Sequence, residues 1–427
     1  VKELSIPQLE VLADEMRQAL LKRASKHGGH FGPNFGMVEA TIALHYVFNS
    51  PKDKIVYDVS HQSYPHKMLT GRKDAYLYEE HYDDVSGFTN PKESEHDFFT
   101  IGHTSTSVSL AMGLAKGRDL TGGKENIIAV IGDGSLSGGE ALEGLNNAAM
   151  LGSNMIIIVN DNDQSIAENH GGLYKGLKEL RDTNGESPDN IFKAMGLEYY
   201  YLGDGHDVSA LIKLFTSVKD IDRAVVLHIH TIKGKGLKYA EENKEYWHAG
   251  GPFHIEDGSP KGPGWPVNET VRESVLDLIE KRSDVVAITA GTPSVIGFTE
   301  DYRKRAGKQF VDVGIAEEHA VAMASGIARN GGTPIFGVFS PFLQRTYDQL
   351  SSDLCLNNNP AVIMVFMASV YGMNSNTHLG IYDIPMISHI PNLVYLAPTS
   401  KEEYLAMFKY ATTQLSLIHI SEPTRHL

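Results

Sequence analysis

Short apolar runs alternate with amphipathic helical patterns along most of the chain, and this alternation limits the folds open to it. The runs have the length of buried strands and stand at 127–131, 155–160, 225–231, 284–290, 310–313, 334–339, 361–367 and 393–397. Helical spacing of apolar residues predicts helices over 4–26, 104–118, 139–151, 207–219, 267–282, 317–329, 342–354 and 400–413. Strands that are connected through helices form mainly parallel sheets flanked by helices, so we predict an α/β fold.

One stretch rich in glycine and proline divides this pattern. EDGSPKGPGWP (256–266) has little apolar content and is typical of an interdomain linker. We therefore expect a first α/β domain over 1–262 and a second, incomplete one over 263–414. The segment LSLIHISEPTRHL (415–427) resembles the translation of a sequencing adapter, and we predict that it is a non-native tail outside the fold, with no strand of its own.

The composition argues against several classes of function and location. Lysine and arginine total 38 against 53 aspartate and glutamate residues, and the net charge of −15 argues against broad binding to nucleic acid. A single cysteine, Cys355, excludes an internal disulfide framework and fits a reducing compartment. No apolar run reaches the roughly 18 residues of a membrane span, and the charged, amphipathic N-terminal segment is unlike a signal peptide. We expect a cytoplasmic protein that binds neither nucleic acid nor membrane.

Two polar clusters follow apolar runs at corresponding places. GDGSLSGGEALEGL (132–145) comes directly after the run 127–131, and NDND (160–163) ends the next one. Asp133 and Asn162 lie 29 residues apart, which is one strand–helix–strand crossover, so both belong at the same edge of a parallel sheet. A carboxylate and an amide oxygen suit a hard cation such as Mg²⁺, and the neighbouring glycines let a diphosphate approach the backbone. The alternative is that Asp133 only caps a helix and that NDND is a plain turn.

This spacing resembles the thiamine diphosphate motif of the transketolase superfamily. Further motifs resemble the 1-deoxy-D-xylulose-5-phosphate synthase family in their order and spacing: GGHFGPNFG (28–36), YDVSHQSYPHKMLTGR (57–72), TIGHTSTSVSLAMGLA (100–115), TIKGKG (231–236), DVGIAEEHAVAMASGIA (312–328), FLQRTYDQ (342–349) and THLGIYD (377–383). The resemblance covers residues 1 to about 414. It implies a diphosphate-binding and a pyrimidine-binding domain, with the family's third domain missing, in a cytoplasmic, homodimeric transferase of isoprenoid and thiamine biosynthesis.

The same resemblance implies roles for individual residues. Ligands of Mg²⁺ are implied at Asp133, Asn162 and the carbonyl of Gln164. Contacts with thiamine diphosphate are implied for His61, Gly102, His103, Thr104, Gly134, Ser135, Asn162, Glu317 and Phe342. Histidines implied to face the reacting carbon are His30, His103, His248 and His378, together with Glu317 as the catalytic carboxyl group. Lys233 and Arg345 are implied to lie toward the substrate.

The chemistry explains these residue types. A carboxyl group that is hydrogen-bonded to the cofactor's pyrimidine ring promotes its activation, which requires Glu317 in a dry place. Imidazoles donate hydrogen bonds to carbonyl oxygens that gain negative charge during the reaction. Plainer alternatives are that Glu317 only favours the helix dipole, that His103 belongs to a helix cap, and that Lys233 is a solvated loop residue. His228 and His230 lie within one predicted strand and are expected to be structural.

Positions that the family uses for its substrates differ here. Met367 stands where the family has an arginine that contacts the phosphate of the aldehyde, and Asn374 stands for its aspartate. Phe339 and Leu237 replace tyrosines. Methionine cannot replace a bidentate, charge-assisted phosphate contact, so the acceptor positions are altered while the cofactor positions are kept.

The resemblance implies an enzyme that decarboxylates pyruvate and condenses the two-carbon unit with glyceraldehyde 3-phosphate, giving 1-deoxy-D-xylulose 5-phosphate and CO₂. Two alternatives stay open. One is a transketolase-like paralogue that uses the same cofactors with another donor or acceptor, and the other is an inactive, truncated fragment.

Overall fold

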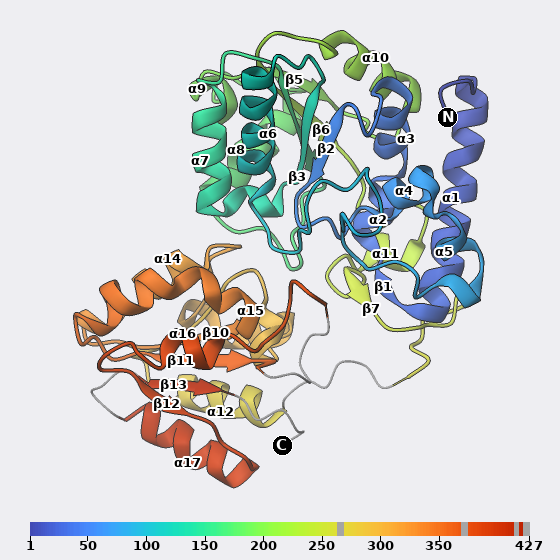
Figure 1. Ribbon diagram of the computed structural model, residues 1–427. Coiled ribbons are helices and arrows are strands. Elements are labelled where there is room, and N and C mark those ends of the chain that lie inside the picture. Colours follow the sequence, from blue (N-terminus) through green and yellow to red (C-terminus); the bar gives the residue numbers. More distant parts are fainter. Residues whose placement is uncertain (263–268, 369–374, 414–417, 422–427) are drawn as a thin grey trace. The chain divides into compact units, whose positions relative to one another are not determined.

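The computed structural model describes residues 1–262, 269–368, 375–413 and 418–421, the last range by its backbone only. The chain forms two compact units, Val1–Gly264 and Trp265–Leu427. Each unit contains a sheet of parallel strands covered by helices, so the predicted α/β fold is confirmed (Figure 1). No helix within the described ranges is long and apolar enough to cross a lipid bilayer.

The first unit is built on a mostly buried sheet. Its strands are β1 (Gly29–His30), β2 (Lys54–Tyr57), β3 (Ile127–Gly132), β4 (Met155–Asp161), β5 (Glu198–Leu202), β6 (Ala224–His230) and β7 (Ala249–Gly250). Its helices are α1 (Ile6–His27), α2 (Gly32–Gly36), α3 (Val38–Val47), α4 (Tyr64–Lys67), α5 (Asp74–Leu77), α6 (Ser107–Thr121), α7 (Gly139–Ala148), α8 (Gly172–Asp182), α9 (Ile191–Ala194), α10 (Val208–Val218) and α11 (Lys238–Glu242). Shorter helical turns are η1 (Met68–Arg72), η2 (Glu79–His81) and η3 (Gly134–Ser137).

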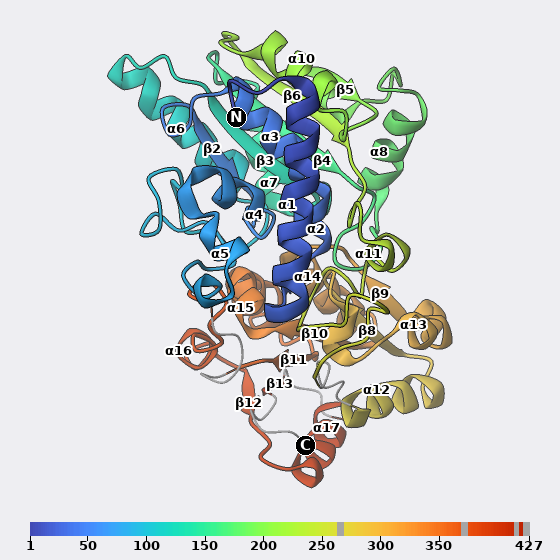
Figure 2. The same cartoon turned by 90° about the vertical axis from the view of Figure 1, so that its right-hand side faces the viewer.

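Five of these strands form one parallel sheet in the order β2-β3-β4-β6-β5. Side chains alternate between its faces, so Ala129 of β3 belongs to the core under α6 and α7, whereas Val130 packs with α3 and α10. Figure 1 shows these two helix layers on opposite sides of the sheet, and Figure 2 shows α1 outside the layer that contains α3. Burial on both faces explains why β3 and β4 are continuous apolar runs.

The second unit has a similar sheet. Its strands are β8 (Val285–Thr289), β9 (Phe310–Asp312), β10 (Thr333–Phe339), β11 (Val362–Phe366), β12 (Val394–Leu396) and β13 (Ile418–Ser421), in the parallel order β12-β13-β11-β10-β8-β9. Its helices are α12 (Glu269–Lys281), α13 (Glu300–Ala306), α14 (Glu317–Arg329), α15 (Ser340–Leu343), α16 (Asp383–Ile387) and α17 (Lys401–Ala411). Shorter turns are η4 (Pro293–Ile296), η5 (Gly307–Gln309), η6 (Gln344–Thr346) and η7 (Gln349–Cys355).

Two expectations about the second unit are wrong. The single helix predicted over 342–354 is divided between α15, η6 and η7, because its apolar spacing does not reveal the changes in helical winding. The prediction that no strand lies in the tail fails for β13, which pairs with β11 and β12. Strand pairing depends on backbone hydrogen bonds, which any β-prone segment can supply. Whether 415–427 is a native sequence stays a prediction.

Candidate active site

The two polar clusters meet at the carboxyl edge of the sheet in the first unit. Gly132 at the end of β3 is in register with Asn160 of β4, and the Asp133 N–H donates to the Asn160 carbonyl at 3.0 Å. Asp133 is 1% exposed and Asn162 is 9% exposed. The Asp133 carboxylate accepts hydrogen bonds from the Gln164 N–H at 3.1 Å and from the Asn169 amide at 2.7 Å. Asp133 is therefore joined by hydrogen bonds to the loop after β4, which carries Asn162 and Gln164.

Asp133 does not serve as a helix cap. The short turn η3 follows it, and the Asp133 side chain makes no capping hydrogen bond there. The next helix, α7, begins after Gly138. At Gly134, an added Cβ would lie 2.5 Å from the Ser165 hydroxyl, so the loop after β4 lies directly against the glycine turn. The capping alternative is wrong, and the glycine is required by this close approach.

The oxygens of this cluster are suited to a hard cation. The buried Asn162 Oδ1 has no hydrogen-bond partner among the described residues. Burial raises the pKa of Asp133, and the neighbouring Asp161 carboxylate adds to this effect. Within the described ranges, no three His, Cys, Asp or Glu side chains gather to hold a metal, so a cation here would depend on amide and carbonyl oxygens as well.

A second, fully buried carboxylate, that of Asp161 at the end of β4, supports the loop that follows this strand. Asp161 accepts a hydrogen bond from His228 Nε2 at 2.8 Å, and Tyr199 contacts the other ring nitrogen of that histidine at 2.8 Å. Arg181 of α8 bridges Asp161 at 2.6 Å and Asp163 at 2.7 Å. Burial by itself would raise the pKa of Asp161, but His228 and Arg181 hold it below its usual range. His228 is structural, as expected, whereas the sequence reasoning missed Asp161 and Arg181.

Three histidines from distant segments form a cluster in the first unit. The rings of His30 and His61 lie 5.1 Å apart, His61 and His248 lie 5.2 Å apart, and His30 and His248 lie 5.8 Å apart. The antiparallel pairing of β1 with β7 places His30 opposite Ala249 and so explains how His248 reaches it. Burial lowers the pKa of His30 to about 4, and burial together with Lys233 lowers that of His248. Both imidazoles are therefore neutral at pH 7.

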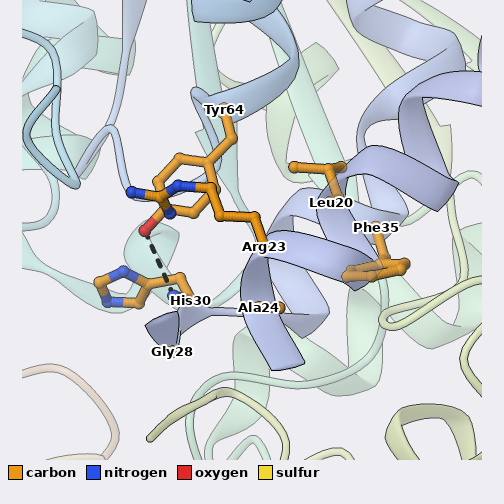
Figure 3. A pocket seen from close by; sticks show the side chains of 7 residues that line it. All are labelled: Leu20, Arg23, Ala24, Gly28, His30, Phe35 and Tyr64. Atoms are coloured by element: carbon orange, nitrogen blue, oxygen red, sulfur yellow. Dashed lines mark hydrogen bonds between the residues drawn. The ribbon is translucent and has the colours of Figure 1, made fainter. Parts of the chain in front are cut away.

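The side chains of Tyr64 and Arg23 hold the backbone at His30 in place. The His30 N–H donates to the Tyr64 hydroxyl at 3.3 Å, as the dashed line in Figure 3 shows. The Arg23 guanidinium lies 5.3 Å from the centre of the Tyr64 ring and donates to the carbonyls of Ala75 and Tyr82. These contacts fix the short strand β1 and with it the position of the His30 ring.

The turn that carries Gly102, His103 and Thr104 lies beside the glycine turn of β3. Ser105 has a φ of 77° and donates its hydroxyl to the Ser135 carbonyl at 2.8 Å. The Asp58 carboxylate accepts from the Ser105 N–H at 2.8 Å and from the Ser107 N–H at 2.9 Å, where α6 begins. Asp58 therefore serves the role of helix cap that was considered for His103. His103 and Thr104 are half-buried in this turn.

Lys233 is not a solvated loop residue. It is 1% exposed, and its ammonium donates to the Ser165 carbonyl. Burial lowers its pKa to about 7, against the opposing effect of the Asp133 carboxylate. The lysine that was expected to lie toward the substrate thus contacts the loop of the cation cluster.

The remaining predicted residues belong to the second unit. Glu317 begins α14 after the β9 segment, is 3% exposed, and its Oε2 has no hydrogen-bond partner within the described ranges. Burial raises its pKa to about 7, although Arg345 opposes the shift. The Phe342 ring lies 5.7 Å from His378 at 78°, and His378 Nδ1 contacts the Thr377 hydroxyl at 2.9 Å.

Of the altered acceptor positions, Met367 has a distinctive backbone. It follows β11 with a φ of 57°, and an added Cβ at Gly380 would lie 2.1 Å from its carbonyl oxygen. Phe339 ends β10, with its ring 6.0 Å from that of Phe342, and Leu237 is buried. Asn374 lies outside the described residues.

Comparison with known proteins agrees with this arrangement. Residues 1–187 and 182–231 match the family model described as 1-deoxy-D-xylulose-5-phosphate synthase, and residues 266–424 match that of the transketolase pyrimidine binding domain. The chain is 39% identical to 1-deoxy-D-xylulose-5-phosphate synthase of Carboxydothermus hydrogenoformans, over 94% of this chain and 70% of the relative. For the synthase 1 of Geobacter metallireducens the identity is 40%, over 94% and 71%.

A solved structure shares the fold. The transketolase of Campylobacter jejuni is 17% identical, with a TM-score of 0.50 over 99% of this chain and 79% of that one. The sequence matches narrow the assignment further than the fold does, because they cover both units and include relatives well above the identity at which a family is secure. The chain belongs to the 1-deoxy-D-xylulose-5-phosphate synthase family of thiamine-diphosphate-dependent transferases.

Proposed function

We propose that this chain carries the 1-deoxy-D-xylulose-5-phosphate synthase activity of its family. It would decarboxylate pyruvate and join the two-carbon unit to glyceraldehyde 3-phosphate, giving 1-deoxy-D-xylulose 5-phosphate and CO₂ for isoprenoid biosynthesis, as a homodimer in the cytoplasm. The observation that carries the proposal is Glu317, a buried carboxyl group with a raised pKa and an oxygen without a partner among the described residues. Such a group is suited to proton exchange at neutral pH.

The residues of the first unit fit the diphosphate end of thiamine diphosphate together with Mg²⁺. Asp133, the Asn162 Oδ1 and the Gln164 carbonyl would hold the metal, and diphosphate oxygens would complete its coordination. Backbone N–H groups of the turn at Gly134 and Ser135, which follows Asp133 at the end of β3, would donate to the diphosphate. We accordingly assign 1–262 to diphosphate and metal binding, and 263–414 to pyrimidine binding by Glu317 and Phe342.

When bound, thiamine diphosphate would supply a nucleophilic carbon and an acceptor for the electron pair that decarboxylation releases. Glu317 would hold a proton at Oε2 or release it, since its pKa of about 7 makes both forms available. His30 and His248, which are neutral, would donate to carbonyl oxygens that gain negative charge, and His103 and His378 are proposed for the same task. Arg345 is the cation assigned to the substrate side.

One observation favours a second candidate, a transketolase-like enzyme with a different acceptor. Met367, which stands directly after β11 in a left-handed backbone conformation, offers no charge for a phosphate group. If the phosphate group of glyceraldehyde 3-phosphate is not bound near Met367, another aldehyde would be the acceptor, and the chemistry of the cofactor would be unchanged.

Calorimetric titration of thiamine diphosphate with Mg²⁺, followed by CO₂ release from pyruvate, tests these proposals. Binding followed by CO₂ release that accelerates when glyceraldehyde 3-phosphate is added would support the synthase. Binding without that acceleration would favour the second candidate. Absence of binding by this chain would overturn both proposals for it and leave the inactive fragment.

A further inference from the structure

Lys233 lies at a junction between two parts of the candidate site. Its ammonium donates to the Ser165 carbonyl, one residue beyond Gln164 in the loop after β4. Its aliphatic chain passes closely over α2, since an added Cβ at Gly32 would lie 2.9 Å from Lys233 Cγ. A buried ammonium that donates a hydrogen bond to a backbone carbonyl holds that carbonyl in place.

A second lysine of the same segment contacts the same loop. Lys244 donates to the Asn162 carbonyl at 3.2 Å. The two lysines therefore hold the peptide groups on either side of Gln164. Both come from the stretch between β6 and β7, and no residue of that stretch is among the proposed metal ligands.

This stretch also carries His248 of the histidine cluster. The Gly32 N–H donates to the Trp247 carbonyl at 2.9 Å, the Phe31 N–H donates to the His248 carbonyl at 3.0 Å, and the Gly234 N–H donates to the Gly32 carbonyl at 3.0 Å. Phe31 and Gly32 thus join the backbone next to Lys233, at Gly234, to the backbone at Trp247 and His248. After burial, the Lys233 ammonium is the largest influence that lowers the pKa of His248, followed by His61 and His30.

We propose that Lys233 is a positioning residue, which ties the loop of Asn162 and Gln164 to the segment of His248, so that cation binding and the placement of this histidine depend on one another. The proposal rests on the proposed function, because it takes these two residues as metal ligands. It differs from the substrate-side role implied by the family resemblance, since the ammonium is directed at a backbone carbonyl.

Removing Lys233 changes the Mg²⁺ affinity in opposite directions, depending on whether this lysine positions the loop or acts only through its charge. A positive charge near a cation site repels the cation, so a Lys233 that acts only by its charge would weaken Mg²⁺ binding, and its removal would strengthen it. A Lys233 that holds the loop would have the opposite effect when removed. Loss of such supporting contacts typically reduces metal affinity 10- to 100-fold, roughly.

The experiment titrates Mg²⁺ by calorimetry at saturating thiamine diphosphate, with the unaltered protein, Lys233→Met and the control Lys235→Met. Lys235 lies two residues away in the same loop and is half-buried. We expect weaker Mg²⁺ binding in Lys233→Met, by roughly 10- to 100-fold, and no change in the control. Equal or stronger binding in Lys233→Met would overturn the proposal. Failure of the unaltered protein to bind would instead overturn the proposed function.

A cofactor-free measurement tests the link to the histidine. In protein with labelled histidine, the NMR titration of His248 is followed in the unaltered protein and in both lysine variants. We expect Lys233→Met to raise the pKa of His248, because it removes the ammonium that lowers it, and Lys235→Met to leave it unchanged. An unchanged His248 titration in Lys233→Met would contradict the proposed dependence.

Discussion

The two units treat a buried carboxyl group in opposite ways. Asp161 in the first unit receives hydrogen bonds from His228 and Arg181, which keep its pKa low and its charge in place. Glu317 in the second unit is equally withdrawn from water, but its Oε2 has no partner among the described residues, and its pKa rises to about 7. The first group is therefore suited to holding a loop, and the second to exchanging a proton.

The difference shows how surroundings decide the function of the same chemical group. Burial disfavours the charge of both carboxylates, and only the donors around them decide the outcome. Asp133 lies between these extremes, since it accepts two hydrogen bonds and yet has a raised pKa. A cation beside it would complete its stabilisation, which is the reason for placing the metal there.

The largest effect is expected from Glu317→Gln on turnover. Glutamine keeps the size and the burial of the side chain but cannot exchange a proton, so CO₂ release from pyruvate should fall by roughly 10²- to 10⁴-fold. The half-buried neighbour in Glu318→Gln serves as the matched control and should retain activity. If Glu317→Gln were nearly as active as the control, Glu317 would not exchange a proton in the reaction, and its contrast with Asp161 would not hold.

The same substitution should stabilise the cofactor-free protein at alkaline pH. The folded-state pKa of Glu317 is raised from 4.5 to about 7, so its carboxyl group stays protonated in the folded state while it ionises in the unfolded one. The contribution of protonated Glu317 to the free energy of unfolding is therefore fully present below about pH 4.5. It is lost as the pH rises toward 7, which lowers the free energy of unfolding by about 3 kcal/mol in total.

Denaturant unfolding of Glu317→Gln and of the unaltered protein checks this expectation. The variant should be more stable by about 3 kcal/mol at pH 8, with little difference at pH 4.5, because glutamine has no charge to bury. An equal difference at both pH values would mean that packing, and not ionisation, distinguishes the two proteins.

Asp133→Asn should weaken the binding of thiamine diphosphate with Mg²⁺ by roughly 100-fold, since it removes the one carboxylate among the proposed ligands. Calorimetry against the exposed control Asp189→Asn measures the loss. Unchanged affinity would mean that Asp133, like Asp161, only supports the loop, and that the metal site is not at Asp133.

The sequence predicts those parts of the molecule that depend on local pattern. The runs that became β3, β4, β6, β10 and β11 are apolar because both faces of a parallel sheet are buried, so their existence was predictable. The short strand β2 and the tyrosine-rich β5 were missed, since neither is a continuous apolar run. The pairing of β1 with β7 joins residues more than two hundred positions apart, which no local pattern reveals.

The candidate site divides along the same line. Asp133 and Asn162 were found because each follows a strand at a spacing that one crossover explains. Arg181 was missed, because it is one cation on an amphipathic helix. Lys233 was named, but as a residue on the substrate side and not as a support of the loop after β4. Their roles depend on burial and on contacts distant in sequence, and the direction of Lys233 differs from the one implied by resemblance.

The smallest effect is expected from Arg181→Met, which tests whether the support under the metal loop matters for binding. Methionine keeps the aliphatic contacts of Arg181 on α8 but removes the bridge between Asp161 and Asp163, so Mg²⁺ affinity should fall by roughly tenfold. Lys178→Met on the same helix removes only an exposed ion pair with Asp182 and should have no effect. Calorimetry at saturating thiamine diphosphate compares the two. Equal affinities would mean that His228 alone keeps Asp161 ionised, and that the contrast with Glu317 depends on one donor and not on a network.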